Sequence, residues 1–145
     1  MSTEMHETRI SSCKIFSLKS LSHEKYKGVA IYDAFLQNTF DFTLKRIFYQ
    51  YEIPQSMSRG AHAHKKCHQI LISVKGSLDV IVDDSFQQVT YSLNSPLLGL
   101  YLPAGLWASQ TNFAEGTICI VLASENYDED DYFRFYGDFL KYKNK

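Results

Sequence analysis

The sequence is short of the residues and patterns on which several classes of protein depend. Its 145 residues include three cysteines, three prolines, seven glycines and one tryptophan, and the net charge is only −1 at neutral pH. No apolar run approaches the roughly 18 residues that span a bilayer. The chain has no Pro/Gly/Ser-rich linker and no internal repeat. These shortages exclude a disulfide framework and a membrane-spanning helix, and they give no reason to expect nucleic acid or a membrane surface as a partner.

The three cysteines indicate a reducing compartment. Cys13, Cys67 and Cys119 are odd in number and share no spacing typical of a zinc site, so we expect free thiols. The polar start MSTEMHETR also lacks the apolar region of a secretory signal peptide. The sequence therefore predicts a cytoplasmic protein.

Short runs rich in β-branched and aromatic residues recur along most of the chain, which holds ten Tyr and ten Phe. Such runs, among them CKIFSL, GVAIYDA, HQILISV and TICIVLA, are separated by turn signals such as Lys75-Gly76. This spacing predicts an antiparallel sandwich or barrel. We expect one all-β domain over residues 1–145, with residues 1–9 flexible.

The last part of the sequence changes to a helical pattern. In YDEDDYFRFYGDFLKYK, Asp128 stands where a helix N-cap is favoured, and acidic residues fill the next turn, where the helix dipole favours negative charge. Aromatic and apolar residues then recur at helical spacing, namely Tyr132, Phe135, Tyr136, Phe139 and Leu140. The pattern predicts a single C-terminal α-helix over residues 128–142 that lies on the barrel.

The segment KRIFYQYEI predicts a strand with two different faces. One face would carry Ile47, Tyr49, Tyr51 and Ile53, and the other Arg46, Phe48, Gln50 and Glu52. Neither face is cleanly polar, which favours a strand with a sheet or subunit on one side and a substrate cavity on the other. We expect Tyr49 and Tyr51 to point into the cavity.

Three of the five histidines lie in the stretch SRGAHAHKKCHQILISVKG. His62 and His64 are spaced so that a strand points both rings to one face. The stretch resembles the first motif of a cupin barrel, with Gln69 at the position of a Glu and Gly76 at that of a Gly. The second cupin motif is matched by Pro103, Gly105, Ala108 and Asn112. The resemblance implies a cupin-type antiparallel jelly-roll barrel.

Two of the four usual cupin metal ligands are absent. Gln69 replaces the usual Glu and Ala108 the usual His, and two imidazoles alone hold a divalent ion weakly. His68 is the alternative third ligand, but a turn at KKC favours Gln69 at the inward position. We therefore expect a site without metal or cofactor. Two histidines with a purely structural role are the plain alternative.

Imidazoles that hold no metal are suited to proton transfer. Histidine titrates near neutrality, so it can take up a proton and return it at physiological pH. A tyrosine hydroxyl across the cavity would serve as the partner acid, and Tyr49 and Tyr51 are the candidates. The residues thus indicate acid–base chemistry on a carbon acid.

Four segments resemble the sugar-nucleotide 3,4-ketoisomerases, the WxcM-like family of the RmlC-like cupins. They are RIFYQY, RGAHAHKKCHQILI, GLYLPAGLWASQ and VLASENYDEDDYFRFYGDFLKY. The resemblance implies an isomerase that moves the carbonyl of a dTDP-4-keto-6-deoxyhexose from C4 to C3 without a metal. A base would remove the C3 proton to give an enediol, and an acid would protonate C4. The product would go to a transaminase that makes a 3-amino sugar for surface glycans.

The resemblance also implies roles by position. His64 would be the base, His62 its partner or a group that binds the sugar oxygens, and Tyr49 a member of the proton relay. Arg59 would bind the diphosphate, with Arg46 as a second candidate, because a guanidinium matches phosphate oxygens. The other residues expected to contact the substrate are Tyr51, Gln69, Trp107 and Lys27.

Two positions depart from the family pattern. Ala108 stands where family members often carry His or Arg, so the stereochemistry at C4 of the product stays open. Lys27-Gly28 stands where the family often has Arg-Gly. Related enzymes are dimers, some of which exchange N-terminal strands, so the resemblance implies a homodimer.

Three other functions fit parts of the pattern. A 3,5-epimerase shares the barrel, but its base is usually primed by an Asp, and here Asp79 or Asp83 would have to approach in space. A non-catalytic sugar-binding cupin would not need both histidines. A metal oxygenase would use His62, His64 and His68 as ligands.

Overall fold

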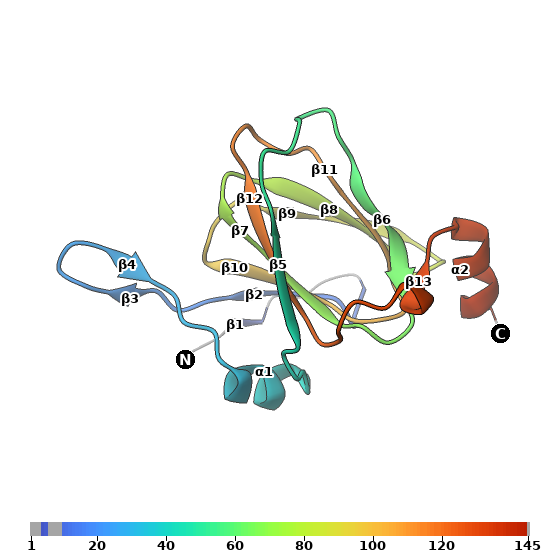
Figure 1. The fold of residues 1–145 in the computed structure, drawn as a ribbon, viewed down its shortest axis with the longest axis horizontal. Helices are drawn as coiled ribbons and strands as arrows, with labels where there is room; N and C mark the ends of the chain where they lie inside the picture. The colour runs from blue at the N-terminus through green and yellow to red at the C-terminus, as the bar shows by residue number, and fades with distance from the viewer. Residues whose placement is uncertain (1–3, 6–9, 145) are drawn as a thin grey trace.

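The computed structural model describes residues 4–5 and 10–144, and its strands, apart from one short hairpin, form two antiparallel sheets that face each other (Figure 1). The first sheet consists of β1 (Glu4–Met5), β2 (Lys14–Ser17), β10 (Leu98–Leu102), β7 (Gln69–Lys75), β12 (Ile118–Ala123) and β5 (Arg46–Gln50), in that order. The second consists of β13 (Tyr132–Phe133), β6 (Arg59–His64), β11 (Trp107–Thr111), β8 (Leu78–Asp83) and β9 (Gln88–Leu93). This is the jelly-roll barrel that the sequence predicts.

The hydrophobic core lies between the sheets because most strands present one apolar face inward. In β9, for example, Val89, Tyr91 and Leu93 are buried and the residues between them are exposed. The central strand β7 is buried over its first five residues. Cys13, Cys67 and Cys119 are all buried as free thiols. Removing this apolar surface from water is the main source of stability of such a barrel.

Glycines of the two cupin-like motifs are required by the backbone. Gly76 follows β7 with a φ of 76°, and a Cβ at this position would lie 2.4 Å from Oγ1 of Thr117. Gly105 precedes β11 with a φ of 86°. Both angles lie in the left-handed region that favours glycine. The turns at these two motif positions therefore require glycine.

The segment GVAIYDA does not form the strand that its composition predicts. Its start belongs to β4 (Lys27–Gly28), which pairs with β3 (Leu21–Ser22) in a hairpin that projects from the barrel (Figure 1). Its end begins α1 (Asp33–Phe40), whose Phe35 and Leu36 are buried against the first sheet. The prediction was wrong because the burial of these two side chains outweighs the local β propensity.

The predicted C-terminal α-helix is present, but its predicted bounds of 128–142 are wrong. The chain forms a 3₁₀ helix, η1 (Glu129–Asp131), then the short strand β13, and only then α2 (Tyr136–Lys143). Asp128 does cap a helix, but that helix is η1, where its side chain accepts a hydrogen bond from the N–H of Asp130. None of the described helices is long and apolar enough to cross a membrane.

The helix is interrupted because the segment is held by the barrel on both sides of the break. The carboxylate of Asp131 accepts hydrogen bonds from the N–H groups of Lys66 and Cys67 in the turn after β6. Tyr132 then pairs with His64 as β13 joins the edge of the second sheet. These contacts are long-range, so the local helical spacing of the aromatic residues did not reveal them. Of the predicted flexible residues 1–9, 1–3 and 6–9 lie outside the described residues.

Candidate active site

A pocket of about 360 Å³ lies between the two sheets, and both histidines of the His-x-His pair line it. It reaches the surface at Arg59, Tyr127 and Arg134, which are exposed. His62 and His64 come from β6, between β11 and β13, and their ring centroids are 5.0 Å apart. The sequence correctly predicted that one strand places both imidazoles on the cavity face.

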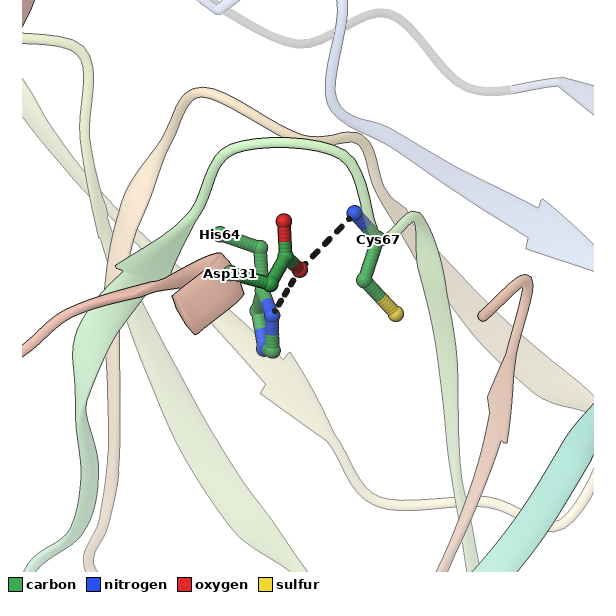
Figure 2. A group of neighbouring side chains, drawn as sticks. All are labelled: His64, Cys67 and Asp131. Carbon is green, nitrogen blue, oxygen red and sulfur yellow. Dashed lines mark hydrogen bonds and ion pairs between the residues drawn. The ribbon is translucent and has the colours of Figure 1, made fainter. Parts of the chain in front are cut away.

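His64 is held by a carboxylate that the sequence analysis did not identify. Its Nδ1 lies 2.9 Å from Oδ2 of Asp131, and both side chains are buried (Figure 2). Burial lowers the pKa of His64 below its ordinary value, and the hydrogen bond to Asp131 opposes that shift. The neutral imidazole therefore donates Nδ1–H to the carboxylate, which leaves the lone pair on Nε2.

Asp131 is itself fixed in place by the turn between β6 and β7. Its Oδ1 accepts a hydrogen bond of 2.7 Å from the N–H of Lys66, and its Oδ2 accepts one of 3.2 Å from the N–H of Cys67 (Figure 2). The carboxylate thus has three donors. Because three hydrogen bonds hold this carboxylate in place, Asp131 sets both the tautomer and the orientation of the His64 ring.

His62 has different surroundings. It is only half-buried, and no hydrogen bond reaches its ring from the described residues, so its nitrogens are open to the pocket. Burial is the main cause that lowers the pKa of His62 to about 4, and the neighbouring His64 ring and Arg134 guanidinium act in the same direction. His62 is therefore neutral at physiological pH and accessible to a ligand. The Nε2 of His64, by contrast, is buried and has no hydrogen-bond partner among the described residues.

Gln69 and Ala108 stand at two positions where cupins usually carry metal ligands. Gln69 and Ala108 both line the pocket. His68 does not join them, because its Nδ1 accepts a hydrogen bond from the N–H of Ala104 and its ring lies near Tyr101. The alternative of His68 as a third ligand is therefore wrong.

One other group of side chains has atoms close enough to share a metal ion. Candidate ligand atoms of His64, Cys67 and Asp131 lie within 4.8 Å of one another (Figure 2). The carboxylate oxygen nearest His64 already accepts two hydrogen bonds, and burial raises the pKa of the Cys67 thiol. A thiol ligates a metal as the thiolate. The hydrogen-bonded His–Asp pair thus explains this cluster better than a metal site does.

The two faces of β5 are reversed relative to the prediction. Tyr49 and Tyr51 are 63% and 60% exposed and point away from the pocket, while Arg46, Phe48 and Gln50 line it. The alternation itself was predicted correctly. The choice of face was wrong because a lone strand does not reveal which of two mixed faces meets the opposite sheet.

The other predicted contact residues divide between pocket and surface. Arg59, Arg46 and Gln69 line the pocket. Trp107 packs its ring against Phe139 of α2, at 5.8 Å between centroids, and is absent from the pocket lining. Lys27 lies on the projecting β3–β4 hairpin and is absent from it as well. The structure of the single chain thus leaves Trp107 and Lys27 outside the pocket lining, and a contact of either residue with the substrate stays a prediction.

A strap of residues 127–134 covers part of the pocket and was missed as a source of site residues. Tyr127, Tyr132 and Arg134 line the pocket from this strap. Tyr127 and Arg134 both donate hydrogen bonds to Glu129, and the contact with Arg134 lowers the pKa of Glu129 to about 2. The block YDEDDY was noticed in the sequence, but its helical spacing hid the inward direction of these side chains.

Three buried polar atoms without hydrogen-bond partners among the described residues meet in this pocket. They are Nε of Arg46, Oε1 of Gln50 and Nε2 of His64. A buried polar group without a partner is unfavourable, so native proteins rarely leave several in one place. The arrangement fits a pocket whose polar partners are supplied by a ligand.

The chain is similar to enzymes that act on nucleotide sugars. Residues 11–144 match the family FdtA, described as WxcM-like, C-terminal. The chain is 37% identical over 131 residues to TDP-4-oxo-6-deoxy-alpha-D-glucose-3,4-oxoisomerase from Aneurinibacillus thermoaerophilus, covering 89% of this chain and 91% of that protein.

Solved structures show the same similarity. A 3,4-ketoisomerase from Helicobacter canadensis is 32% identical, with a TM-score of 0.86 over 92% of this chain and 98% of that one. A histidine-to-asparagine mutant of the 3,4-ketoisomerase QdtA from Thermoanaerobacterium thermosaccharolyticum, in complex with TDP-4-keto-6-deoxyglucose, is 29% identical, with a TM-score of 0.86 over 93% and 96%. The 3,5-epimerase RmlC from Legionella pneumophila is 12% identical, with a TM-score of 0.80 over 96% of this chain and 81% of that one, and shares the fold.

Proposed function

The chain belongs to the WxcM-like, C-terminal (FdtA) family, and from this premise we propose that it is a sugar-nucleotide 3,4-ketoisomerase. Its substrate is dTDP-4-keto-6-deoxyglucose and its product the 3-keto isomer. The observation in the site that supports this most is the pair of neutral histidines beside three unpartnered polar atoms. The product is a ketosugar that a transaminase would convert to a 3-amino sugar for surface glycans.

The reaction moves one hydrogen between carbons and one proton between oxygens. A base removes the hydrogen from C3, the C3–C4 double bond forms, and the carbonyl oxygen at C4 takes up a proton to give an enediol. The hydroxyl at C3 then loses its proton, the C3 carbonyl forms, and C4 takes up a proton. The site must therefore supply a base near both carbons and a group that exchanges protons with the oxygens.

The surroundings of the two histidines favour His62 as the group that contacts C3 and C4. A general base must come within hydrogen-bond distance of the proton it takes, and the ring nitrogens of His62 are open to the pocket while Nε2 of His64 is buried. The expected roles are thus exchanged in this proposal. His64, oriented by Asp131, exchanges protons with the oxygens through Nε2, the buried pocket atom that has no partner among the described residues.

The arginines of the pocket are suited to the diphosphate. Arg46 has an unpartnered Nε, and the Nη1 of Arg59 contacts only the sulfur of Met57 among the described residues, at 3.7 Å. Arg134 is occupied by Glu129 in a two-point ion pair. Arg46 and Arg59 form no ion pair with a carboxylate of the described residues, so they are the guanidinium groups we assign to phosphate oxygens.

The exposed face of β5 supports a homodimer. Ile47, Tyr49 and Tyr51 form an apolar row on an edge strand, each more than half exposed. Exposed apolar patches on sheet edges are typical of subunit interfaces. In this proposal the protein acts as a dimer in the cytoplasm. Sedimentation equilibrium would return the monomer mass if this is wrong.

The 3,5-epimerase remains the second candidate because of one observation. The sequence pattern offered only Asp79 or Asp83 as the carboxylate of a primed base, but Asp79 accepts hydrogen bonds from Ser92 and Asn112 and Asp83 accepts one from Tyr136. Asp131 takes that place beside His64. An NMR time course with dTDP-4-keto-6-deoxyglucose in deuterated water separates the two. A ketoisomerase yields a 3-keto product labelled at C4 and leaves C5 unlabelled, whereas an epimerase labels C3 and C5 and keeps the ketone at C4.

A further inference from the structure

The pocket contains a glutamine to which neither the sequence pattern nor the reaction chemistry assigns a role. Gln50 ends β5, on the same face as Arg46 and Phe48, and its Oε1 is buried in the pocket. Across the strand pair it lies in register with Cys119 of β12, which is apolar in character and fully buried. No described residue donates a hydrogen bond to this oxygen.

The chemical character of each unpartnered atom restricts what it can bind. Nε of Arg46 is a donor, so it is satisfied by a phosphate or carbonyl oxygen. Nε2 of His64 is an acceptor because Nδ1 holds the ring proton against Asp131. Oε1 of Gln50 is also an acceptor, and an ionised diphosphate offers no hydrogen to it.

We propose that Gln50 is a substrate-binding residue whose Oε1 accepts a hydrogen bond from a neutral donor of the nucleotide sugar, a hydroxyl or a ring N–H. The inference rests on the proposed function, since it takes the ligand to be a nucleotide sugar. In this arrangement Gln50 contacts a neutral part of the substrate, and the arginines contact the diphosphate.

A structural role does not account for the position. Glutamine side chains that support a fold are bonded to backbone or side-chain groups. Gln110, which lines the same pocket, donates to Sγ of Cys119 at 3.7 Å. The carbonyl of Gln50 has no such partner. In the unliganded protein, a side chain of equal length without the amide would therefore lose no hydrogen bond to this oxygen.

The test replaces the amide and keeps the side-chain length, in the variant Gln50→Met. We expect KM for dTDP-4-keto-6-deoxyglucose to rise about 3- to 10-fold, the loss of one neutral hydrogen bond. We expect kcat to change less than threefold and the melting temperature of the unliganded protein to stay the same or rise. Gln37→Met, on the exposed surface of α1, is the matched control and should change neither constant.

Two results would overturn the inference. One is an unchanged KM in Gln50→Met while the wild-type protein isomerises the substrate, which leaves the proposed function intact. The other is a fall in melting temperature with equal losses in kcat and kcat/KM, which would assign Gln50 to the fold. Gln50→Asn keeps the amide but shortens the side chain by one methylene, so it repeats the test with a second variant. A wild-type protein that turns over no ketosugar would instead reject the function itself.

Binding of dTDP alone identifies the donor. Calorimetry on wild type and Gln50→Met should give equal affinities for dTDP if the donor is a hydroxyl of the hexose. A lower affinity of the variant for dTDP would place the donor on the nucleoside. Both results support the inference, and they assign the contact to different parts of the substrate.

Discussion

His62 and His64 lie two residues apart on one strand and face one pocket, yet they are held in opposite ways. His64 is 5% exposed and donates to a carboxylate that two backbone N–H groups fix in place. His62 is open to the pocket and has no hydrogen bond from the described residues. The difference shows that a repeated residue type on one face need not share one role.

The physical origin of the difference is a single long-range contact. Asp131 stands 67 residues after His64 in the chain, and it reaches only one of the two rings. Desolvation lowers the pKa of both histidines, but only His64 is hydrogen-bonded to a carboxylate that opposes the shift, whereas Glu129 opposes it at His62 through its charge alone. Asp131 therefore orients His64 and makes its ring more basic, while His62 is the ring that is more accessible to a ligand.

The largest expected effect comes from removing the accessible ring. His62→Asn should lower kcat by about 10²- to 10⁴-fold, the usual contribution of a general base, while the melting temperature changes little because the ring has no hydrogen bond to lose. Steady-state kinetics and a melting curve measure both. A variant that keeps more than a tenth of the wild-type kcat would show that His62 does not move the proton.

The next effect comes from the support of the buried ring. Asp131→Asn places an amide where three donors converge, so it should lower kcat/KM by about 10- to 100-fold, as losses of residues that orient a ligating histidine do. It should also lower the free energy of unfolding by about 1–3 kcal/mol, because a buried N–H loses its acceptor. Asp130→Asn, at the exposed neighbouring position, is the matched control. If Asp131→Asn and Asp130→Asn behave alike in both measurements, Asp131 has no special role in the site.

The pH profile tests the same contrast with a smaller change. The pKa of His62 is lowered to about 4 and that of His64 lies below its ordinary value, and only the neutral rings act as acceptors. The value of kcat/KM should therefore stay level from pH 8 to about 6 and fall at lower pH, below the ordinary histidine value of about 6.5. A midpoint above 6.5 would contradict the burial of these rings.

The same shift makes stability depend on pH. The unfolded chain binds a proton at His62 below about pH 6.5, whereas the folded chain resists protonation until about pH 4. The free energy of unfolding should thus be highest above pH 6.5 and decline as pH falls from 6.5 to 4. Urea unfolding of wild type and His62→Asn should give a shallower decline for the variant. Parallel curves would show that His62 is not desolvated in the folded protein.

The smallest effect is expected on the outer face of β5. Tyr49→Phe removes a hydroxyl that points away from the pocket, so kcat should stay within about twofold of wild type, since surface substitutions rarely disturb a distant site. A loss of tenfold or more would restore the role in proton transfer that the sequence pattern predicted for this tyrosine.

Local patterns predicted the barrel and part of the site. The His-x-His spacing placed two imidazoles on one face and the turn glycines marked the cupin-like motifs. Arg46, Arg59 and Gln69, which were predicted to contact the substrate, all line the pocket. These features depend on strand periodicity and on backbone angles, which are properties of neighbouring residues.

Features that depend on tertiary contacts were not predictable in the same way. The segment around Asp131 follows helical spacing, but its carboxylate binds the β6–β7 turn and pulls the chain into the site. Tyr49 and Phe48 alternate on β5 as expected, but only the opposite sheet decides which of them is inside. Trp107 is turned outward because α2 packs on it.

The most direct test of the account is a deuterium-exchange time course by NMR on wild type, His62→Asn and His64→Asn with dTDP-4-keto-6-deoxyglucose. The account predicts that wild type forms a 3-keto product labelled at C4. It predicts that His62→Asn neither forms product nor exchanges the hydrogen at C3, while His64→Asn still exchanges it slowly. Exchange at C3 by His62→Asn at a rate near that of wild type would contradict the central claim that the accessible histidine moves the hydrogen.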